Sequence, residues 1–316
     1  MYQIRTDLAL ETQEKMQEDK VELKGVRFSE EHVSKNLTIS TVVIETENGA
    51  KAMEKPKGTY ITIEASNMDE EDEDYHREIS EQLARVLKQL IDVKKEDVSV
   101  LIVGLGNRAV TPDALGPYVA DNLCVTRHIV KEYGKYAMGM EHARLVSAIV
   151  PGVMGQTGME TLEIVKGIVE ETYPHLVIAV DALAARNSKR LNRTIQIADT
   201  GIHPGSGVGN HRNGINKEAL GVPVISIGVP TVVDAATIVG DTMEEMVETL
   251  DSSGKVRGFG GALGTLNRVE KQQMIRELLS PHLNTMYVTP KDIDETVKRI
   301  SFTISEGINI ALGGMA

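Results

Sequence analysis

Short apolar runs that alternate with helical segments constrain the fold of this chain more than any other feature. The apolar runs cover residues 98–103, 145–150, 176–180 and 222–229, and segments of helical periodicity lie between and after them. Strands that alternate with helices predict βαβ units, in which parallel strands form a sheet and helices cover its faces. We therefore predict an α/β fold with a doubly wound, mostly parallel sheet flanked by helices.

The first part of the chain has a different pattern. Two β-branched runs, 37–44 and 59–63, are separated by a stretch rich in turn residues, and an acidic run follows at 69–74. The two runs predict antiparallel strands, and the acidic run is typical of a solvated linker or of the first turn of a helix. We predict a small N-terminal β-rich appendage with an acidic linker at 10–74, followed by the main α/β domain at 75–316.

Two aspartates, Asp113 and Asp181, follow apolar runs of the predicted sheet. Ligands of open parallel sheets bind outside the carboxyl ends of the strands, so we expect both carboxylates in one crevice. Because like charges repel, one of two neighbouring carboxyls keeps its proton, and the pair can supply both an acid and a base. The alternative for each aspartate is the ordinary role of a helix N-cap.

The loop after the first of these runs contains Gly104, Gly106 and Asn107. With Ala109 it matches the dinucleotide-binding fingerprint, but that fingerprint requires a helix to begin at the loop. Pro112 delays any helix, so nucleotide binding without catalysis is the weaker alternative. We instead expect backbone amides of this loop to donate hydrogen bonds to a developing oxyanion.

His203 lies in a second loop rich in Gly and Pro, which should reach the same crevice. Its alternative role is that of a loop histidine bonded to backbone. The eight histidines are scattered, and the sequence has no His-x-x-x-His or Cys-x-x-Cys pair. A metal site made of Asp113, Asp181 and His203 stays open as the basis of a metal-dependent enzyme, but we predict no metal and no cofactor.

Composition excludes several classes of function. The net charge of −12 argues against nucleic-acid binding, which depends largely on Lys and Arg. No apolar run approaches the roughly 20 residues that span a membrane, and the N-terminus does not resemble a secretory signal. The single cysteine fits a reducing compartment. We expect a cytoplasmic protein.

Six blocks of the sequence together resemble the germination protease family of spore-forming Firmicutes. The blocks are VGLGN (103–107), VTPDALGP (110–117), SAIVPGVMG (147–155), VDALAAR (180–186), GIHPGSGVGN (201–210) and PTVVDA (230–235). The resemblance implies an atypical aspartic endopeptidase whose two carboxylates fall on Asp113 and Asp181. It also implies a fold similar to that of hydrogenase maturation proteases.

The resemblance further implies what this enzyme acts on and how it is made. The substrates would be the small acid-soluble proteins that protect spore DNA, degraded when germination begins in the spore core. The chain would be a zymogen of the forespore, and it would assemble as a homotetramer. Its propeptide would be residues 1–9, with the processing bond between Ala9 and Leu10.

Overall fold

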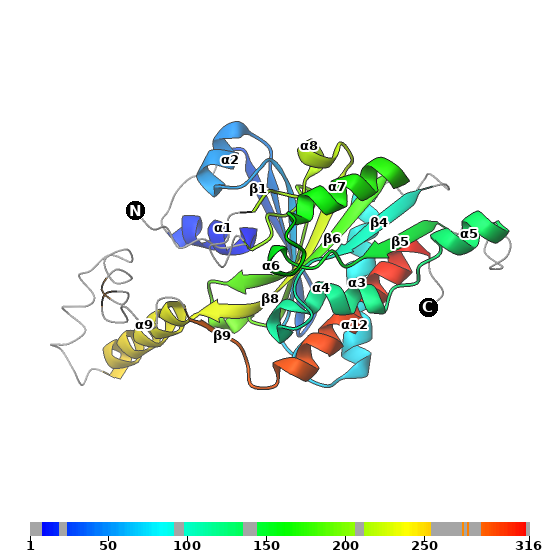
Figure 1. The fold of residues 1–316 in the computed structure, drawn as a ribbon. Helices are drawn as coiled ribbons and strands as arrows, with labels where there is room; N and C mark the ends of the chain where they lie inside the picture. The colour runs from blue at the N-terminus through cyan, green and yellow to red at the C-terminus, as the bar shows by residue number, and fades with distance from the viewer. Residues whose placement is uncertain are drawn as a thin grey trace.

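One nine-stranded sheet with helices on both faces forms the centre of the molecule in the computed structural model (Figure 1). The structure describes residues 8–18, 24–91, 98–134, 144–205, 212–253, 274, 277 and 286–313. Residues 1–7, which make up most of the predicted propeptide, lie outside this set. The predicted α/β class is confirmed.

Four parallel strands form one half of the sheet, in the order β5, β4, β6, β8. Their bounds are β4 (Ser99–Gly104), β5 (Leu145–Ile149), β6 (Leu176–Ala185) and β8 (Val224–Asp234). Each of the four apolar runs of the sequence overlaps one of these strands. Two of the strands are longer than expected, because β6 and β8 stay paired with each other out to Ala185 and Val233.

Antiparallel strands form the other half, and here the structure departs from the expected arrangement. The strands continue from β8 in the order β7, β3, β2, β1, and β9 pairs with the end of β8. Because β3 pairs with β7 from Tyr60 to Glu64, the N-terminal strands extend the main sheet and do not stand apart from it. The sheet is therefore mixed. The bounds are β1 (Val26–Ser34), β2 (Leu37–Ile44), β3 (Gly58–Ala65), β7 (Thr194–Ala198) and β9 (Tyr287–Val288).

Three helices pack on one face of the sheet: α3 (Glu73–Leu90), α4 (Leu115–Asp121) and α12 (Ile293–Leu312). Alternate residues of each strand face them, such as Val100 and Ile102 of β4, because successive side chains of a strand point to opposite faces. The helices contribute apolar side chains at helical spacing, namely Ile79, Leu83, Leu87, Leu115, Val119, Ile300, Ile304 and Ile308. This layer is the main hydrophobic core.

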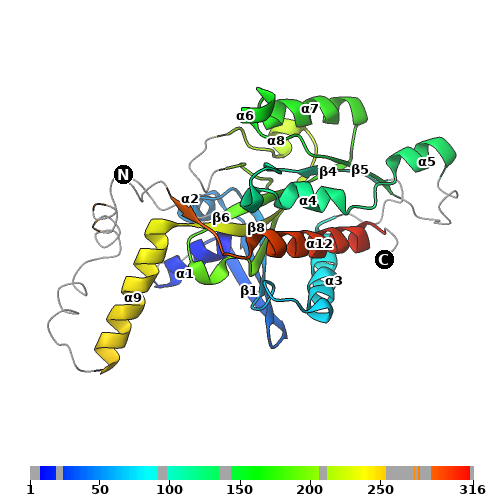
Figure 2. The same cartoon turned by 60° about the horizontal axis from the view of Figure 1, so that its bottom comes forward.

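Other helices cover the opposite face, as Figure 2 shows for α7 and α8. Leu101 and Val103 of β4 pack there against α7, and Val42 and Ile44 of β2 pack in a separate cluster with the start of α1. Helix α9 projects away from the sheet in both views. The bounds are α1 (Ala9–Glu18), α2 (Glu47–Met53), α5 (Arg127–Tyr133), α6 (Met154–Thr157), α7 (Thr161–Thr172), α8 (Lys217–Leu220) and α9 (Ala235–Ser253). Across the described ranges, no helix has the length and apolar character needed to cross a membrane.

Candidate active site

Asp113 is held by the loop that follows strand β4. The strand ends at Gly104, and Asp113 ends a short 3-10 helix, η1 (Thr111–Asp113). The backbone amide of Asn107 donates to the Asp113 carboxylate at 2.8 Å and to the Asp113 carbonyl oxygen at 3.1 Å. Two bonds from one amide fix both the side chain and the backbone of Asp113 relative to the loop.

Glycines allow this loop and the segment after it to approach each other. A Cβ at Gly106, whose φ is +118°, would lie 1.9 Å from the Asp113 carbonyl oxygen. A Cβ at Gly104 would lie 2.3 Å from the carbonyl oxygen of Gly116 in α4. Both contacts are shorter than any real Cβ tolerates, so side chains at these positions would push η1 and α4 outward. The glycines therefore determine where Asp113 lies.

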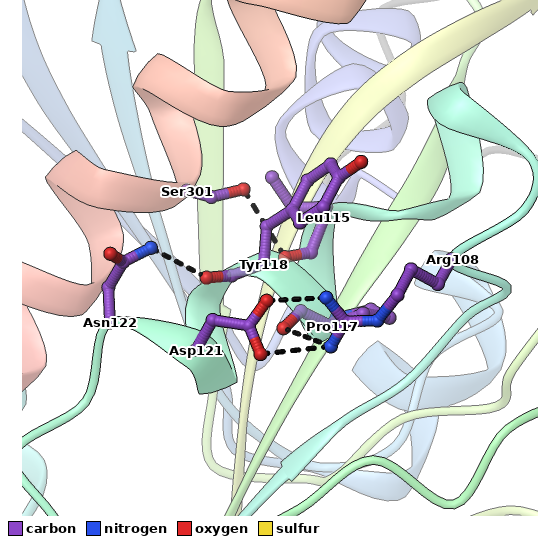
Figure 3. Close-up of polar contacts among 7 residues, drawn as sticks. All are labelled: Arg108, Leu115, Pro117, Tyr118, Asp121, Asn122 and Ser301. Atoms are coloured by element: carbon purple, nitrogen blue, oxygen red, sulfur yellow. Dashed lines mark hydrogen bonds and ion pairs between the residues drawn. The ribbon is translucent and has the colours of Figure 1, made fainter.

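Helix α4 is anchored on both sides (Figure 3). Arg108 of the loop binds the Asp121 carboxylate through both terminal nitrogens, one of them at 2.9 Å, and reaches the Pro117 carbonyl oxygen at 3.4 Å. From α12, the Ser301 hydroxyl donates to the Leu115 carbonyl oxygen at 3.3 Å. The ion pair is about half exposed and contributes up to about 1 kcal/mol, so its main effect is to orient the loop.

Strand β8 anchors the 3-10 helix itself. The hydroxyl of Thr231, a buried residue, donates to the Pro112 carbonyl oxygen at 2.7 Å. The Thr231 carbonyl oxygen in turn accepts from the Thr289 hydroxyl at 2.8 Å. Asp113 thus follows a residue that is bonded directly to the sheet.

Asp181 lies within strand β6, opposite Gly228 of β8. It is one residue past Val180, which pairs with the last residue of β4. Its side chain is buried, with 5% exposed, and its Oδ1 accepts from the Ala182 amide at 3.0 Å. Asp181 therefore lies where the shorter neighbouring strand ends, and not at the end of its own strand as the sequence suggested.

The helix-cap alternative is wrong for both aspartates. Helix α4 begins after Ala114, which makes no side-chain cap hydrogen bond, and Asp113 bonds to the loop on its other side. No helix follows Asp181, because β6 continues to Ala185. Neither carboxylate caps a helix.

A pocket of about 400 Å³ brings the two aspartates together. Its wall includes residues from the loops after β4 and β5, from β6, from the end of β8, and from the stretch at residues 203–205 together with Arg212. They include Leu105, Gly106, Asp113, Val153, Asp181, Leu183, His203, Arg212, Val232 and Tyr287. The expected convergence of these loops on one crevice agrees with this geometry.

His203 and Arg212 reach the pocket from a loop that is closed at its base. Ile202 and Ile215 exchange two backbone hydrogen bonds, of 3.0 and 2.8 Å. The His203 ring lies against Gly214, where a Cβ would be 2.6 Å from Nε2. His203 was expected here. Arg212 was not, because an arginine beyond a glycine-rich stretch has no local pattern that marks it.

The surroundings of Asp113 alter its acidity. Burial raises the pKa of the Asp113 carboxyl above its ordinary value, while the hydrogen bond from the Asn107 amide and the positive charge of Arg212 partly offset that rise. A carboxyl with a raised pKa holds its proton at higher pH than an exposed one. Asp113 is therefore suited to donate a proton.

The loop amides differ from the expectation of a general oxyanion site. The Leu105 amide donates to the Val180 carbonyl oxygen at 2.8 Å, and the Asn107 amide is bonded to Asp113. Counting only described residues, the Gly106 amide has no acceptor within the protein. The Asn107 side chain accepts from Gln156 Nε2 at 2.8 Å. The Gly106 amide belongs to a residue that lines the pocket and can therefore donate to a ligand there.

Ala9 and Leu10, the expected processing residues, stand at the start of α1. Both side chains are buried, and the Ala9 amide donates to Gln196 Oε1 of β7 at 2.6 Å. A peptide bond in this position must leave the core before a protease can bind it. In the described part of the chain, which includes Asp113, Asp181 and His203, no group of three or more His, Cys, Asp or Glu side chains is arranged to hold a metal ion.

Comparison with known proteins gives consistent matches along the chain. The germination protease family model matches residues 4–255 and 246–315. A germination protease of Caldanaerobacter subterraneus subsp. tengcongensis is 52% identical over 310 residues, covering 98% of this chain and 94% of the relative. One from Clostridium perfringens strain SM101 is 46% identical, covering 99% and 96%. One from Bacillus subtilis strain 168 is 43% identical, covering 98% and 94%.

Among solved structures, the NiFe hydrogenase maturation protease HycI from Thermococcus kodakarensis KOD1 matches this chain. The identity is 18% and the TM-score is 0.32, with 71% of this chain and 99% of that chain covered.

Proposed function

Because this chain belongs to the germination protease family, we propose that it is an atypical aspartic endopeptidase that uses Asp113 and Asp181. The membership confirms the resemblance inferred from the sequence and makes the chain a peptidase of spore germination. The observation that carries the proposed mechanism is that both aspartates line one pocket. Two carboxyls in one site can share a proton and divide the roles of acid and base.

In the proposed reaction Asp181 is ionised and Asp113 carries the shared proton. Asp181 removes a proton from a water molecule as the water oxygen bonds to the scissile carbonyl carbon. Asp113 polarises the carbonyl oxygen and then gives its proton to the amide nitrogen as the C–N bond breaks. The raised pKa of Asp113 supports its role as the proton donor. The proton ends on Asp181, and exchange within the pair restores the starting state.

The Gly106 amide is the proposed oxyanion donor. It belongs to a residue that lines the pocket, and the neighbouring amides of the loop are already bonded within the protein. A donor fixed before the reaction stabilises negative charge without reorganisation. The asparagine beside it, Asn107, acts by holding Asp113.

The proposed substrates are small acid-soluble DNA-protecting proteins of the spore. The enzyme is made as a zymogen in the cytoplasm of the forespore, assembles as a homotetramer and acts in the spore core at germination. Processing occurs between Ala9 and Leu10. The burial of both side chains supports a bond that is cut only after the start of α1 has opened.

The test is an assay of the purified chain, and of the same chain without residues 1–9, on a small acid-soluble spore protein. We expect internal cleavage of the substrate, with product termini assigned by mass spectrometry, and the same rate after exhaustive chelation. Loss of cleavage on chelation that one metal restores would favour the metal-dependent alternative. No cleavage, together with a clear thermal shift on adding NAD or ATP, would favour a nonenzymatic nucleotide-binding domain.

A further inference from the structure

Arg212 is a positive group in the candidate active site that the proposed mechanism does not use. It lies three residues before Ile215, whose backbone pairs with Ile202 and closes the loop that carries it. It lines the pocket together with Asp113, Asp181 and His203. Arg212 as a residue is half-buried.

Several other arginines have carboxylate partners, although Arg127, Arg144 and Arg299 form no ion pair among the described residues. Arg85 binds both oxygens of Glu31 at 3.0 Å, and Arg193 binds Asp69 at 2.9 and 3.0 Å. Arg212 forms no ion pair with any residue in the described ranges. It is near enough to Asp113 for its charge to act on that carboxyl, yet the two form no hydrogen bond. A protein of net charge −12 has many carboxylates that could pair with an arginine. Arg212 instead lines the pocket.

A guanidinium in a pocket is suited to one class of ligand group. Its planar fork matches a carboxylate in a two-point hydrogen-bonded contact, and such charge-assisted pairs are among the stronger polar interactions. The wall around it also has apolar members, including Leu105, Val153 and Leu183. The pocket thus offers a site for an acidic side chain beside sites for apolar ones.

We propose that Arg212 binds an acidic side chain of the substrate close to the scissile bond and so determines the preference for Asp or Glu at that position. This inference rests on the proposed peptidase function. The chain's own segment at residues 6–11, Thr-Asp-Leu-Ala-Leu-Glu, has the matching composition, with Asp7 and Glu11 on either side of the Ala9–Leu10 bond. One arginine selects one of these two acids.

The experiment compares three peptides with the sequence of residues 3–14. One is unchanged, one has Asp7→Asn and one has Glu11→Gln. Each is assayed with whichever form of the enzyme cleaves in the assay above, as wild type, Arg212→Ala, Arg212→Lys and Arg77→Ala. Arg77→Ala is the matched control, because it removes the same charge from an exposed position on α3.

For wild type we expect one of the two neutral peptides to lose about 10- to 100-fold in kcat/KM, the range that a hydrogen bond to a charged group supplies. Arg212→Ala should cleave that peptide and the unchanged one within about threefold of each other. Arg212→Lys should keep an intermediate preference, since it retains the charge without the fork, and Arg77→Ala should keep the full wild-type ratio.

The ratio between peptides separates recognition from a merely structural effect, because loss of folded enzyme lowers both rates equally. Wild type that cleaves all three peptides alike would overturn the inference and leave the proposed function standing. An undiminished ratio in Arg212→Ala would do the same. A wild type that cleaves no peptide and no spore protein would contradict both.

Discussion

At the scale of single residues, the position of Asp113 depends on two glycines, because a residue without a Cβ allows two backbone segments to pack closely. Gly104 and Gly106 let the loop after β4 lie against η1 and α4, so that one amide of Asn107 can hold both the carboxylate and the carbonyl of Asp113. A left-handed backbone with a contact of 1.9 Å leaves no room for a Cβ at Gly106.

Substitution of Gly106 by alanine should therefore destabilise the protein by at least about 2 kcal/mol, from strain at the positive φ and displacement of η1. Peptidase activity should fall further than stability alone explains. Gly167→Ala is the control, since that exposed glycine of α7 meets nothing within 4 Å, and alanine should stabilise the helix by up to about 1 kcal/mol. Urea unfolding measures the change in the free energy of unfolding for both variants. Equal effects of the two substitutions would show that the close approach at Gly106 is not what places Asp113.

The raised pKa of Asp113 makes a prediction about stability and pH. The folded state binds this proton more tightly than the unfolded chain does, so its contribution is fully present below the ordinary carboxyl pKa of about 4 and is lost as pH rises through the folded value. Asp113→Asn has no carboxyl to ionise, so the variant does not lose this stability as pH rises. The variant should unfold at a higher temperature than wild type at pH 7.5, and the gain should shrink toward pH 4. Asp74→Asn, at an exposed position of α3, is the control. A gain that is constant with pH or larger in acid would contradict the burial argument.

Sequence patterns alone could locate part of this site. The sequence predicts one crevice for Asp113, Asp181 and His203, because each follows a predicted strand or lies in a glycine-rich loop, and all three line the pocket. Arg212 could not be found in this way, since what brings it to the pocket is the long-range pairing of Ile202 with Ile215. The sequence predicts oxyanion donors in the glycine loop, but it does not predict that amides of this loop also hold Asp113 and pair with β6. The loop amides are divided between holding Asp113, pairing with β6 and facing the pocket.

At the scale of elements, the four parallel strands followed from apolar runs, but the extent of β6 and β8 did not. Asp181 interrupts the apolar run at 176–180, and the sequence pattern therefore predicts an end of the strand at that residue. The strand continues because β8 continues beside it. Strand β7 was missed, since its five residues are short and become a strand only between β3 and β8. The joining of the N-terminal strands to the main sheet depends on that missed strand.

This junction predicts that the two halves of the sheet unfold together. Ile63 of β3 is fully buried in the main core and pairs with Ile195 of β7. Ile63→Ala should cost about 2–5 kcal/mol and lower one transition that far-UV circular dichroism and the near-UV signal of the tyrosines report together. An early transition confined to the N-terminal strands would show that they form an independent unit.

At the scale of the whole molecule, self-processing would make the N-terminal segment a substrate of the active site. The Ala9–Leu10 bond is buried, and the hydrogen bond from the Ala9 amide to Gln196 helps to hold it. Loss of this hydrogen bond costs about 1 kcal/mol. It should therefore raise several-fold the population of molecules in which the start of α1 has opened. Gln196→Ala should therefore lose residues 1–9 several times faster than wild type by intact mass.

The same substitution in an Asp113→Asn background should leave the chain at full length, which separates self-processing from a contaminating protease. If Gln196→Ala were processed at the wild-type rate, opening of α1 would not limit processing. If the double variant were still cut at Ala9, another enzyme would be responsible.

The central claim is that Asp113 and Asp181 act as one catalytic pair. Its most direct measurement is kcat/KM for a peptide of residues 3–14 with wild type, Asp113→Asn, Asp181→Asn and the control Asp74→Asn, each checked for folding by thermal unfolding. Each pocket variant should fall by roughly 10²–10⁴-fold, the contribution of a positioned acid or base. The double variant should be little worse than either single one, because the two residues work as a unit. Full activity in either single variant, with the fold intact, would contradict the account.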